Sequence, residues 1–331
     1  MNLSKLRFLF LFVLVFCLRP AFATDPETIR VGVLKFGTVN WLLNVVQQHK
    51  LALQQGVNLE VVPLGSKNAT HVAIQGGAVD MIVTDWVWVS RQRSEGRDFS
   101  FAPYSTAVGS ILVRPDSGIS NVSELAGKKL GVAGGPVDKS WLLLRAYASK
   151  ELGLDLTRLV EPSFGAPPLL NKLALKGDLQ GALNFWHYAA RLKAAGFKTI
   201  ITVPEILSKL GVDATAPLIG WTFHETWADA HQKALKGLLR AFDQAKEIML
   251  RSDDEWARLK PMLKAEDSAT EIALREGFRE GIPRCFDQST VDAASRIFDV
   301  LAQEGGEKLV GRGKHLSEGT FWSHLDYLPC Q

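Results

Sequence analysis

The sequence predicts an α/β fold built from two units, each with mostly parallel strands covered by helices. Strand and helix patterns alternate from residue 28 to residue 86, and the same alternation restarts at residue 129. From residue 226 to about residue 305 the pattern is almost purely helical, and we expect these helices to pack back onto the first unit. Alternation of this kind is typical of parallel sheets with helices on both faces.

The first unit has the order βαβαβ. Runs rich in β-branched residues predict strands at 28–37, 58–65 and 80–86. Apolar residues at helical spacing predict helices at 39–56 and 68–77. We therefore expect three neighbouring parallel strands joined by two helices.

The second unit follows a segment at 109–114 and repeats the same order. Its strands are expected at 129–135, 157–164, 181–186 and 198–203. Its helices are expected at 137–153, at 167–178 and directly after residue 186. The segment 217–223 then leads into the helical region.

The first 23 residues predict a secretory signal peptide. Lys5 and Arg7 precede an apolar run at 8–18, and the triplet Ala-Phe-Ala at 21–23 suits a cleavage site. The run is about half of the ~20 residues that a helix needs to cross a bilayer. We expect cleavage after Ala23, loss of Cys17 with the peptide, and a periplasmic mature protein.

The charge balance argues against nucleic-acid binding. Removing residues 1–23 lowers Lys+Arg from 38 to 35, which equals the 35 Asp+Glu. The mature chain then carries no net formal charge and has no basic stripe for phosphate contacts. About 308 residues remain, enough for two ordinary domains.

Two cysteines remain in the mature chain, Cys285 and Cys330. An oxidising compartment favours a disulfide between them, and two separate thiols are the alternative. Such a bridge would close a loop of about 46 residues and would stabilise the fold by up to about 4 kcal/mol.

The candidate ligand site lies where the strands end, because ligands bind such sheets beyond the carboxyl ends of the strands. Five of the nine tryptophans fall in these segments beside short polar side chains, as a concave site with aromatic walls requires. At 184–187, we expect Asn184 to hydrogen-bond a ligand and Trp186 to stack on it; an ordinary strand-to-helix junction is the alternative. The candidate ligand-binding residues are Thr38, Asn40, Trp41, Ser66, Asn68, Thr84, Asp85, Trp86, Gly135, Lys139, Ser140, Ser163, Asn184, Trp186 and Trp221.

The sequence leaves the charge of the ligand open. Aromatic walls favour a cationic or planar organic solute. The glycines and Pro136 at the start of the helix at 137–153 favour an anion or a carbonyl group, unless this segment is an ordinary tight turn. A bare metal ion is not expected, since Asp85 and Asp138 are the only acids in these segments and hard cations require several oxygen ligands. No cofactor is expected either.

Motifs of catalysis are incomplete, and we predict no enzymatic activity. The stretch "HETWA" at 224–228 begins like a zinc-protease helix but carries Ala228 where the second histidine is required. The chain has no G-x-S-x-G nucleophile motif.

Three stretches resemble one family of transport proteins. "LAGKKLGVAGGPVDKSWLLLRAYASKELGL" at 125–154 is similar to the start of the second lobe in periplasmic solute-binding proteins of ABC importers, of the nitrate/taurine/aliphatic-sulfonate type that also includes thiamine-precursor binders. The stretch at 73–86 resembles the helix, turn and strand of the first lobe in that family, and 173–196 resembles the equivalent part of the second. The family usually has Asp-Ala where this chain has Gln180-Gly181.

The resemblance implies a type II periplasmic binding protein fold with two lobes around a solute. It implies crossovers near 110–115 and 216–221, a first lobe of residues 24–112 and 215–331, and a second lobe of 113–214. The implied function is that of a monomeric receptor that captures a small organic solute and delivers it to an ABC permease. The alternatives are a ligand-sensing receptor for a membrane signalling protein and an enzyme of the thiamine-pyrimidine-synthesis type.

Overall fold

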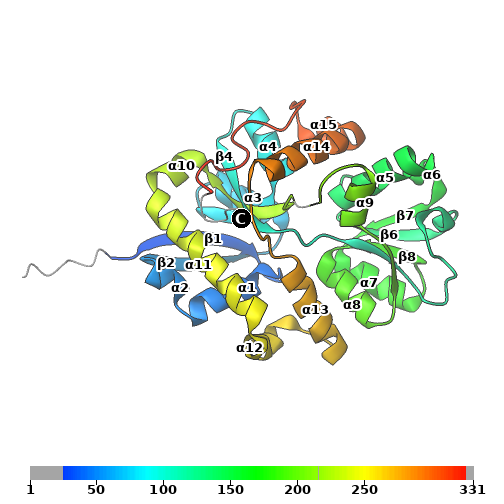
Figure 1. Ribbon diagram of the computed structural model, residues 1–331, viewed down its shortest axis with the longest axis horizontal. Coiled ribbons are helices and arrows are strands. Elements are labelled where there is room, and N and C mark those ends of the chain that lie inside the picture. The colour runs from blue at the N-terminus through cyan, green and yellow to red at the C-terminus, as the bar shows by residue number, and fades with distance from the viewer. Residues whose placement is uncertain (1–24, 215, 326–331) are drawn as a thin grey trace, which may run out of the picture.

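Two five-stranded sheets form the framework of the molecule (Figure 1). The structure is a computed structural model that describes residues 25–214 and 216–325. Its strands are β1 (Glu27–Leu34), β2 (Val57–Leu64), β3 (Met81–Asp85), β4 (Phe99–Ser105), β5 (Ser110–Val113), β6 (Lys129–Ala133), β7 (Glu161–Gly165), β8 (Gly181–Asn184), β9 (Lys198–Thr202) and β10 (Ile219–His224).

Helices flank both sheets. They are α1 (Val39–Gln48), α2 (Leu51–Gln54), α3 (Lys67–Gln75), α4 (Trp86–Ser94), α5 (Lys139–Leu152), α6 (Leu156–Leu159), α7 (Pro167–Lys176), α8 (Trp186–Ala194), α9 (Val203–Lys209), α10 (Glu225–Ala230), α11 (Gln232–Arg251), α12 (Asp253–Leu263), α13 (Ser268–Glu280), α14 (Gln288–Gly305) and α15 (Glu307–Val310), with one 3₁₀ turn, η1 (Val122–Leu125).

Each sheet contains one strand that opposes its neighbours. The first sheet has the order β2-β1-β3-β10-β4, in which β10 is antiparallel to both β3 and β4. The second sheet has the order β7-β6-β8-β5-β9, in which β5 is antiparallel to both β8 and β9. The other pairings are parallel. The predicted class, two mostly parallel sheets flanked by helices, is confirmed.

At each crossover the chain passes from the sheet of one lobe to the sheet of the other. The chain leaves the first sheet after Ser105 and enters the second at Ser110, and it re-enters the first sheet at Ile219. The boundary expected between residues 112 and 113 falls inside β5, whose whole length pairs with β8. All of β5 therefore belongs to the second sheet.

Local sequence explains the elements that differ from expectation. The helix expected at 39–56 is divided into α1 and α2 because Lys50 adopts a left-handed conformation with φ of 54°. The strand expected at 157–164 begins as the short helix α6, which the Asp155 side chain caps. Helices α4 and α9 and strand β4 were not predicted, and β4 forms an edge of the first sheet.

The C-terminal helices connect the two lobes. Helix α11 packs on α1 and α2, α12 packs on α1, and α15 packs on α4, as predicted for a segment that covers the first lobe. Helix α13 also contacts α8 of the second lobe, and α14 contacts α5 (Figure 1). These two helices therefore bridge the lobes as well as covering the first one.

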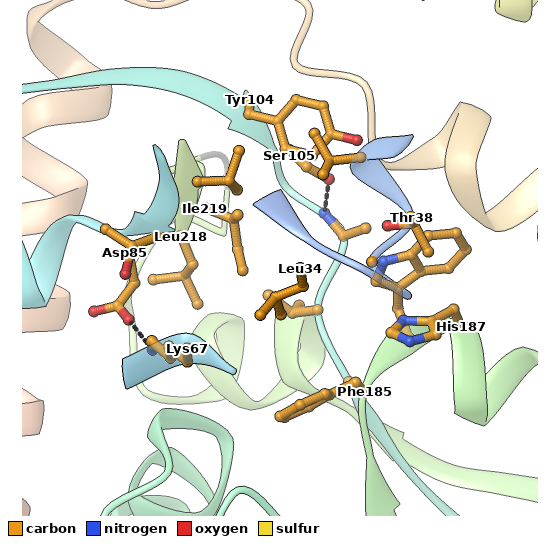
Figure 2. A pocket seen from close by; sticks show the side chains of 18 of the residues that line it. Leu34, Thr38, Lys67, Asp85, Tyr104, Ser105, Phe185, His187, Leu218 and Ile219 are labelled. Carbon is orange, nitrogen blue, oxygen red and sulfur yellow. Dashed lines mark hydrogen bonds and ion pairs between the residues drawn. The ribbon is translucent and has the colours of Figure 1, made fainter. Parts of the chain in front are cut away.

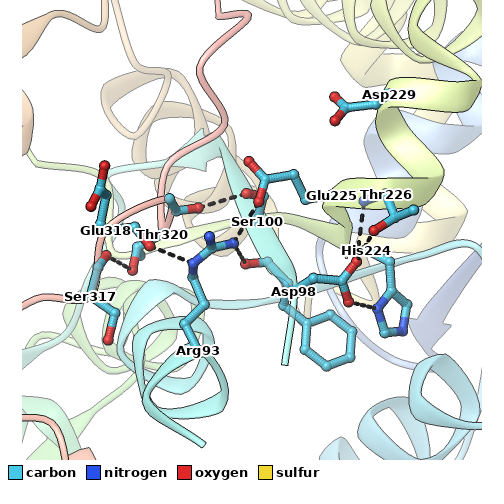
Figure 3. A network of polar contacts seen from close by, with 12 residues as sticks. Arg93, Asp98, Ser100, His224, Glu225, Thr226, Asp229, Ser317, Glu318 and Thr320 are labelled. Atoms are coloured by element: carbon cyan, nitrogen blue, oxygen red, sulfur yellow. Dashed lines mark hydrogen bonds and ion pairs between the residues drawn. The ribbon is translucent and has the colours of Figure 1, made fainter. Parts of the chain in front are cut away.

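A polar network fastens the end of the chain to the first lobe (Figure 3). Arg93 donates to the carbonyl oxygens of Phe99 and Glu318 and pairs with Glu225, with its Nη1 2.9 Å from the Glu225 Oε2. Ser100 Oγ donates to the carbonyl oxygen of Gly319 at 2.6 Å. Because these partners come from β4, α10 and residues 318–319, the network holds three distant segments together.

Three predictions fall partly or wholly outside the described residues. The signal peptide at 1–23 and its cleavage after Ala23 lie before the described part of the chain. Cys330 lies after it. Cys285 is disulfide-bonded, and its expected pairing with Cys330 stays a prediction.

Candidate functional site

A cavity lies between the carboxyl ends of the strands of the two sheets (Figure 2). Its volume is about 280 Å³, close to the ~300 Å³ lower end for small-molecule sites. The first lobe contributes Leu34, Gly37, Thr38, Val39, Lys67, Thr70, Val83, Thr84, Asp85, Tyr104 and Ser105. The second lobe contributes Asp138, Lys139, Ser140, Phe185, Trp186 and His187, and the crossovers contribute Ala107, Val108, Gly109, Leu218 and Ile219. Both lobes and both crossovers therefore enclose one space.

A three-residue charged cluster, Lys67–Asp85–Lys139, joins the lobes inside this cavity. Lys67 Nζ lies 2.8 Å from Asp85 Oδ2, and Lys139 Nζ lies 2.9 Å from the same oxygen. The other carboxylate oxygen of Asp85 accepts a hydrogen bond from the Trp88 N–H at 2.9 Å and caps helix α4. Lys139 opens α5 in the second lobe, so its bond to Asp85 is an ion pair between lobes.

Burial and charge compete at this cluster. Burial alone would raise the pKa of Asp85, but Lys139 and Lys67 outweigh it and hold that pKa well below its usual range. The charge of Asp85 raises the pKa of Lys67, whereas burial lowers the pKa of Lys139. Asp85 and Lys67 therefore remain an ion pair at neutral pH.

The start of α5 holds a second acid, the half-buried Asp138, beside Lys139. Asp138 caps this helix by accepting a hydrogen bond from the Ser140 N–H at 2.9 Å. Burial raises the pKa of Asp138, and the charge of Lys139 only partly offsets this rise. The N-terminus of α5 is thus already capped by its own side chain, as in an ordinary turn into a helix; a site for an anion or a carbonyl group was the other sequence-based interpretation.

Neutral imidazoles border the site. His71 Nε2 lies 3.0 Å from Thr84 Oγ1. Burial, and after it the charge of Lys67, lowers the pKa of His71 to about 4. Burial followed by Arg191 lowers the pKa of His187 to about 4 as well. Both rings are therefore uncharged at neutral pH, and each offers one donor and one acceptor nitrogen.

Aromatic side chains form much of the remaining wall. Trp186 contacts Trp41 edge to face, with ring centroids 6.1 Å apart. Its ring also lies against Gly277 of α13, where a Cβ would come within 3.1 Å of the indole. Burial raises the pKa of Tyr104, and a hydrogen bond with Thr38 opposes this rise. The wall is therefore held by packing from both lobes.

A second, larger cavity of about 550 Å³ lies behind Trp186. The first crossover, α8, β9 and α13 line it, with Ala190, Ala273 and Gly277 among the small residues at its wall. Trp186 borders both cavities, as do Ala107, Val108 and Gly109 of the first crossover.

Arg191 makes another contact between lobes, away from the cavity. Its guanidinium donates to the carbonyl oxygen of Leu263 at 2.7 Å and to that of Lys264 at 3.0 Å, at the C-terminus of α12. It also pairs with Glu266 at 2.7 Å. The same helix, α8, begins at Trp186 in the cavity wall, so the cavity and this contact share one rigid element.

Six of the fifteen candidates from the sequence line the cavity: Thr38, Thr84, Asp85, Lys139, Ser140 and Trp186. Three tryptophans lie in the core instead, because their rings pack against other apolar groups. Trp41 is 6 % exposed, Trp86 is 0 % exposed, and Trp221 stacks on Phe242 with centroids 4.1 Å apart.

Asn184 has structural partners and is outside the cavity wall. Its amide nitrogen donates to Asn171 Oδ1 at 2.8 Å and to the Pro167 carbonyl oxygen at 3.0 Å, while its Oδ1 accepts from the Phe185 N–H. With 1 % of its surface exposed, Asn184 fastens the β8–α8 junction to α7. We therefore leave it out of the proposed ligand contacts.

The remaining candidates also have local roles or lie outside the wall. Asn40 donates to the Leu34 and Gly37 carbonyl oxygens, and Ser66 caps α3. Asn68 is exposed on α3, Gly135 has a positive φ of 108° in the turn before α5, and Ser163 lies within β7.

Several lining residues were missed. Lys67 stands between two candidates, and its charge was a signal that could have been used. Phe185 and His187 flank Trp186 in a stretch already identified as a strand end. Tyr104 could not be placed without β4, which the sequence did not predict.

No membrane span and no metal cluster appear in the part of the chain that the structure describes. Among its helices, none has the length and apolar character needed to cross a bilayer. Over the same residues, His, Cys, Asp and Glu side chains do not gather in groups of three or more that could hold a metal ion.

Comparisons with known proteins establish the fold. Residues 53–169 match the family model described as NMT1/THI5 like. A search of curated proteins gave no match. The periplasmic aliphatic sulphonate binding protein SsuA from Escherichia coli is 19% identical with a TM-score of 0.71, covering 91% of this chain and 99% of that one.

Two further solved structures agree. The alkanesulfonate-binding protein SsuA from Xanthomonas axonopodis pv. citri, bound to MOPS, is 16% identical with a TM-score of 0.65, covering 90% of this chain and 99% of that one. An ABC transporter protein from Parabacteroides distasonis is 14% identical with a TM-score of 0.69, covering 89% and 98%. The chain therefore has the two-lobed fold that the sequence resemblance implied.

Proposed function

We propose that this protein is the periplasmic substrate-binding component of an ABC transporter, which captures a small organic solute between its lobes and delivers it to a membrane permease. The observation that carries the proposal is the 280 Å³ cavity walled by both lobes and both crossovers. A solute in this space contacts both lobes at once. It therefore stabilises the closed arrangement over any open one, as a receptor that reports its loading to a permease requires.

The chemistry of the wall suits capture of a solute. Tyr104, Phe185 and Trp186 offer aromatic surface for a small organic body. Thr38, Thr84 and Ser140 offer hydroxyl groups that fix orientation. Of the fifteen candidates, we retain as proposed ligand contacts only the six that line the cavity.

We further propose export and a monomeric state. Cleavage after Ala23 would release the mature chain to the periplasm, where relatives of the same fold act.

We divide this chain into a first lobe that carries the sheet with β1 and β10, and a second lobe that carries the sheet with β5 and β9.

Two other functions differ in partner or outcome. A ligand-sensing receptor would use the same cavity and closure, but its closed form would contact a membrane signalling protein. An enzyme of the thiamine-pyrimidine-synthesis type would change its ligand chemically, and the match of residues 53–169 to the NMT1/THI5 like model is the observation that favours it. We propose that the chain is not an enzyme, in keeping with the incomplete catalytic motifs of its sequence.

The test is an add-back experiment. The exported protein is unfolded in urea, its released small molecules are collected, and the refolded protein is titrated with them while melting temperature and radius of gyration are followed. We expect one molecule to bind per chain, to raise the melting temperature and to be recovered unchanged. Recovery of a chemically altered molecule would support the enzyme, and failure of every fraction to bind would contradict a receptor.

A further inference from the structure

The interlobe cavity contains equal numbers of basic and acidic side chains. Among its described lining residues, Lys67 and Lys139 are the lysines, and Asp85 and Asp138 are the carboxylic acids. All four lie at the same end of the cavity, around the ends of β3 and the start of α5. Thr38 and His187 line the other side of the cavity (Figure 2).

These four groups already neutralise one another. Asp85 Oδ2 accepts from both lysines, at 2.8 and 2.9 Å. Asp138 is adjacent to Lys139 in the chain and is attracted by its charge. With their usual charges, the two lysines and two aspartates of the lining balance one another.

The histidines do not change this balance. His187 lines the cavity, and burial lowers its pKa to about 4. Its Nδ1 is buried and has no hydrogen-bond partner among the described residues. This ring is therefore a neutral hydrogen-bonding group on the side of the site away from Asp85 and Lys67 (Figure 2).

A charged ligand would disturb a balanced site. An anion would have to draw a lysine from Asp85 or remain uncompensated in a space of low dielectric constant, and an unpaired buried charge is costly. An uncharged ligand leaves both bonds of Asp85 in place. It can still use the hydroxyl groups of Thr38 and Ser140 and the ring of His187.

We propose that the Lys67–Asp85–Lys139 cluster, balanced by the neighbouring Asp138, makes the cavity selective for an uncharged, flat organic solute over the corresponding carboxylate or sulfonate. This deepens the proposed function and rests on it. Asp85 acts here as an internal counter-ion that occupies the two ammonium groups an anionic ligand would use. By contrast, two solved structures of the same fold are binding proteins for anionic sulfonates.

The test uses two probes of similar shape, benzenesulfonamide, which is uncharged at pH 7, and benzenesulfonate. Binding of each is measured by titration calorimetry and by the shift in melting temperature, at constant ionic strength. Three proteins are compared: wild type, Asp85→Asn and the double variant Asp85→Asn/Lys139→Met. Asparagine keeps an oxygen that accepts the Trp88 N–H, so the cap of α4 is preserved.

In the wild type we expect benzenesulfonamide to bind at least tenfold more tightly than benzenesulfonate. Asp85→Asn leaves one lysine uncompensated, so benzenesulfonate should bind this variant at least tenfold more tightly than it binds the wild type. The double variant restores the balance and should lose that gain.

Tighter binding of benzenesulfonate than of benzenesulfonamide by the wild type would overturn the proposal, and so would an Asp85→Asn variant with no gain for the anion. If the wild type binds neither probe, a gain in Asp85→Asn that the double variant loses still supports the charge balance. Failure of the add-back experiment would instead count against the receptor function, so the two failures are distinguishable.

Discussion

Lys139 of the second lobe lies 2.9 Å from Asp85 of the first, on the same carboxylate oxygen that Lys67 reaches from within the first lobe. The two lysines thus share one acceptor but differ in whether their bond crosses between lobes. Lys139 is also the less exposed, with 21 % of its side chain accessible against 52 % for Lys67. Replacing each lysine in turn therefore distinguishes the effect of the bond between lobes from that of the bond within one lobe.

Lys139→Met should favour an open form of the ligand-free protein, because it removes an ion pair between lobes. We expect a larger radius of gyration in small-angle X-ray scattering than for the wild type. Lys67→Met removes an equal charge from Asp85 within one lobe and should leave the radius of gyration unchanged. Equal expansion in both variants, or in neither, would contradict a role of the Asp85–Lys139 bond in closure.

Trp186→Ala should weaken solute binding by about 1–3 kcal/mol, the range for removing a packed aromatic wall. The change also removes a side chain that borders both the interlobe cavity and the second cavity. Trp186→Phe retains a ring and should lose less. Calorimetric titration with the molecule released from the wild type measures the effect.

Asn184→Ala is the structural counterpart of this change. It leaves Asn171 Oδ1 and the Pro167 carbonyl oxygen without their donor, and we expect a loss of about 1–3 kcal/mol in the free energy of unfolding with unchanged affinity of the folded fraction. A loss of affinity without a loss of stability would return Asn184 to the ligand site.

Stability should fall as the pH is lowered from about 6.5 toward 4. The pKa values of His71 and His187 are lowered to about 4 by burial from the usual 6.5, so the unfolded chain binds more protons in this window. The free energy of unfolding therefore rises with pH here, and the contribution is complete above about 6.5. Urea unfolding at pH 7 and pH 5 measures it, and His187→Gln should reduce the difference by on the order of 1 kcal/mol. Identical pH profiles for variant and wild type would contradict burial of a neutral ring.

Arg191→Gln should weaken solute binding although Arg191 does not line the cavity. Its bonds to the end of α12 and to Glu266 join the lobes, so their loss favours the open form and speeds dissociation. We expect a loss of about 1 kcal/mol, since the pair with Glu266 is partly exposed. Lys193→Gln, on the same helix but outside that contact, is the control, and stopped-flow dissociation is the readout. An unchanged dissociation rate in Arg191→Gln would show that this contact does not hold the closed form.

The fold could be predicted from the sequence because a strand or helix that is buried on one face has its apolar residues at a regular spacing. The apolar residues Ile29, Val31 and Val33 alternate along β1, and all are buried. β4 escaped because its seven residues include Pro103 and two serines, which weaken a strand pattern. Its place in the sheet depends on pairing with β10, more than 100 residues later, and no local pattern records that pairing.

The position of the site could be predicted from the sequence, but the set of residues that line it could not. The cavity does lie at the strand ends, but these segments contain both lining residues and core residues. Trp186 and Trp41 follow strands in similar contexts, and only the packing of α12 and α13 decides that Trp41 is covered. The pairing of Asp85 with Lys139 spans 54 residues and depends on how the lobes meet, so spacing could not reveal it.

Native mass spectrometry of the exported protein, purified without denaturation, tests the central claim most directly. If the interlobe cavity holds a solute, the wild type should carry an excess mass of one small organic molecule per chain, and Trp186→Ala purified in parallel should carry less of it. The excess should disappear after unfolding and refolding in buffer and return when the released molecule is added. An excess that is identical in wild type and Trp186→Ala, or a released molecule that does not rebind, would contradict capture of a solute between the lobes.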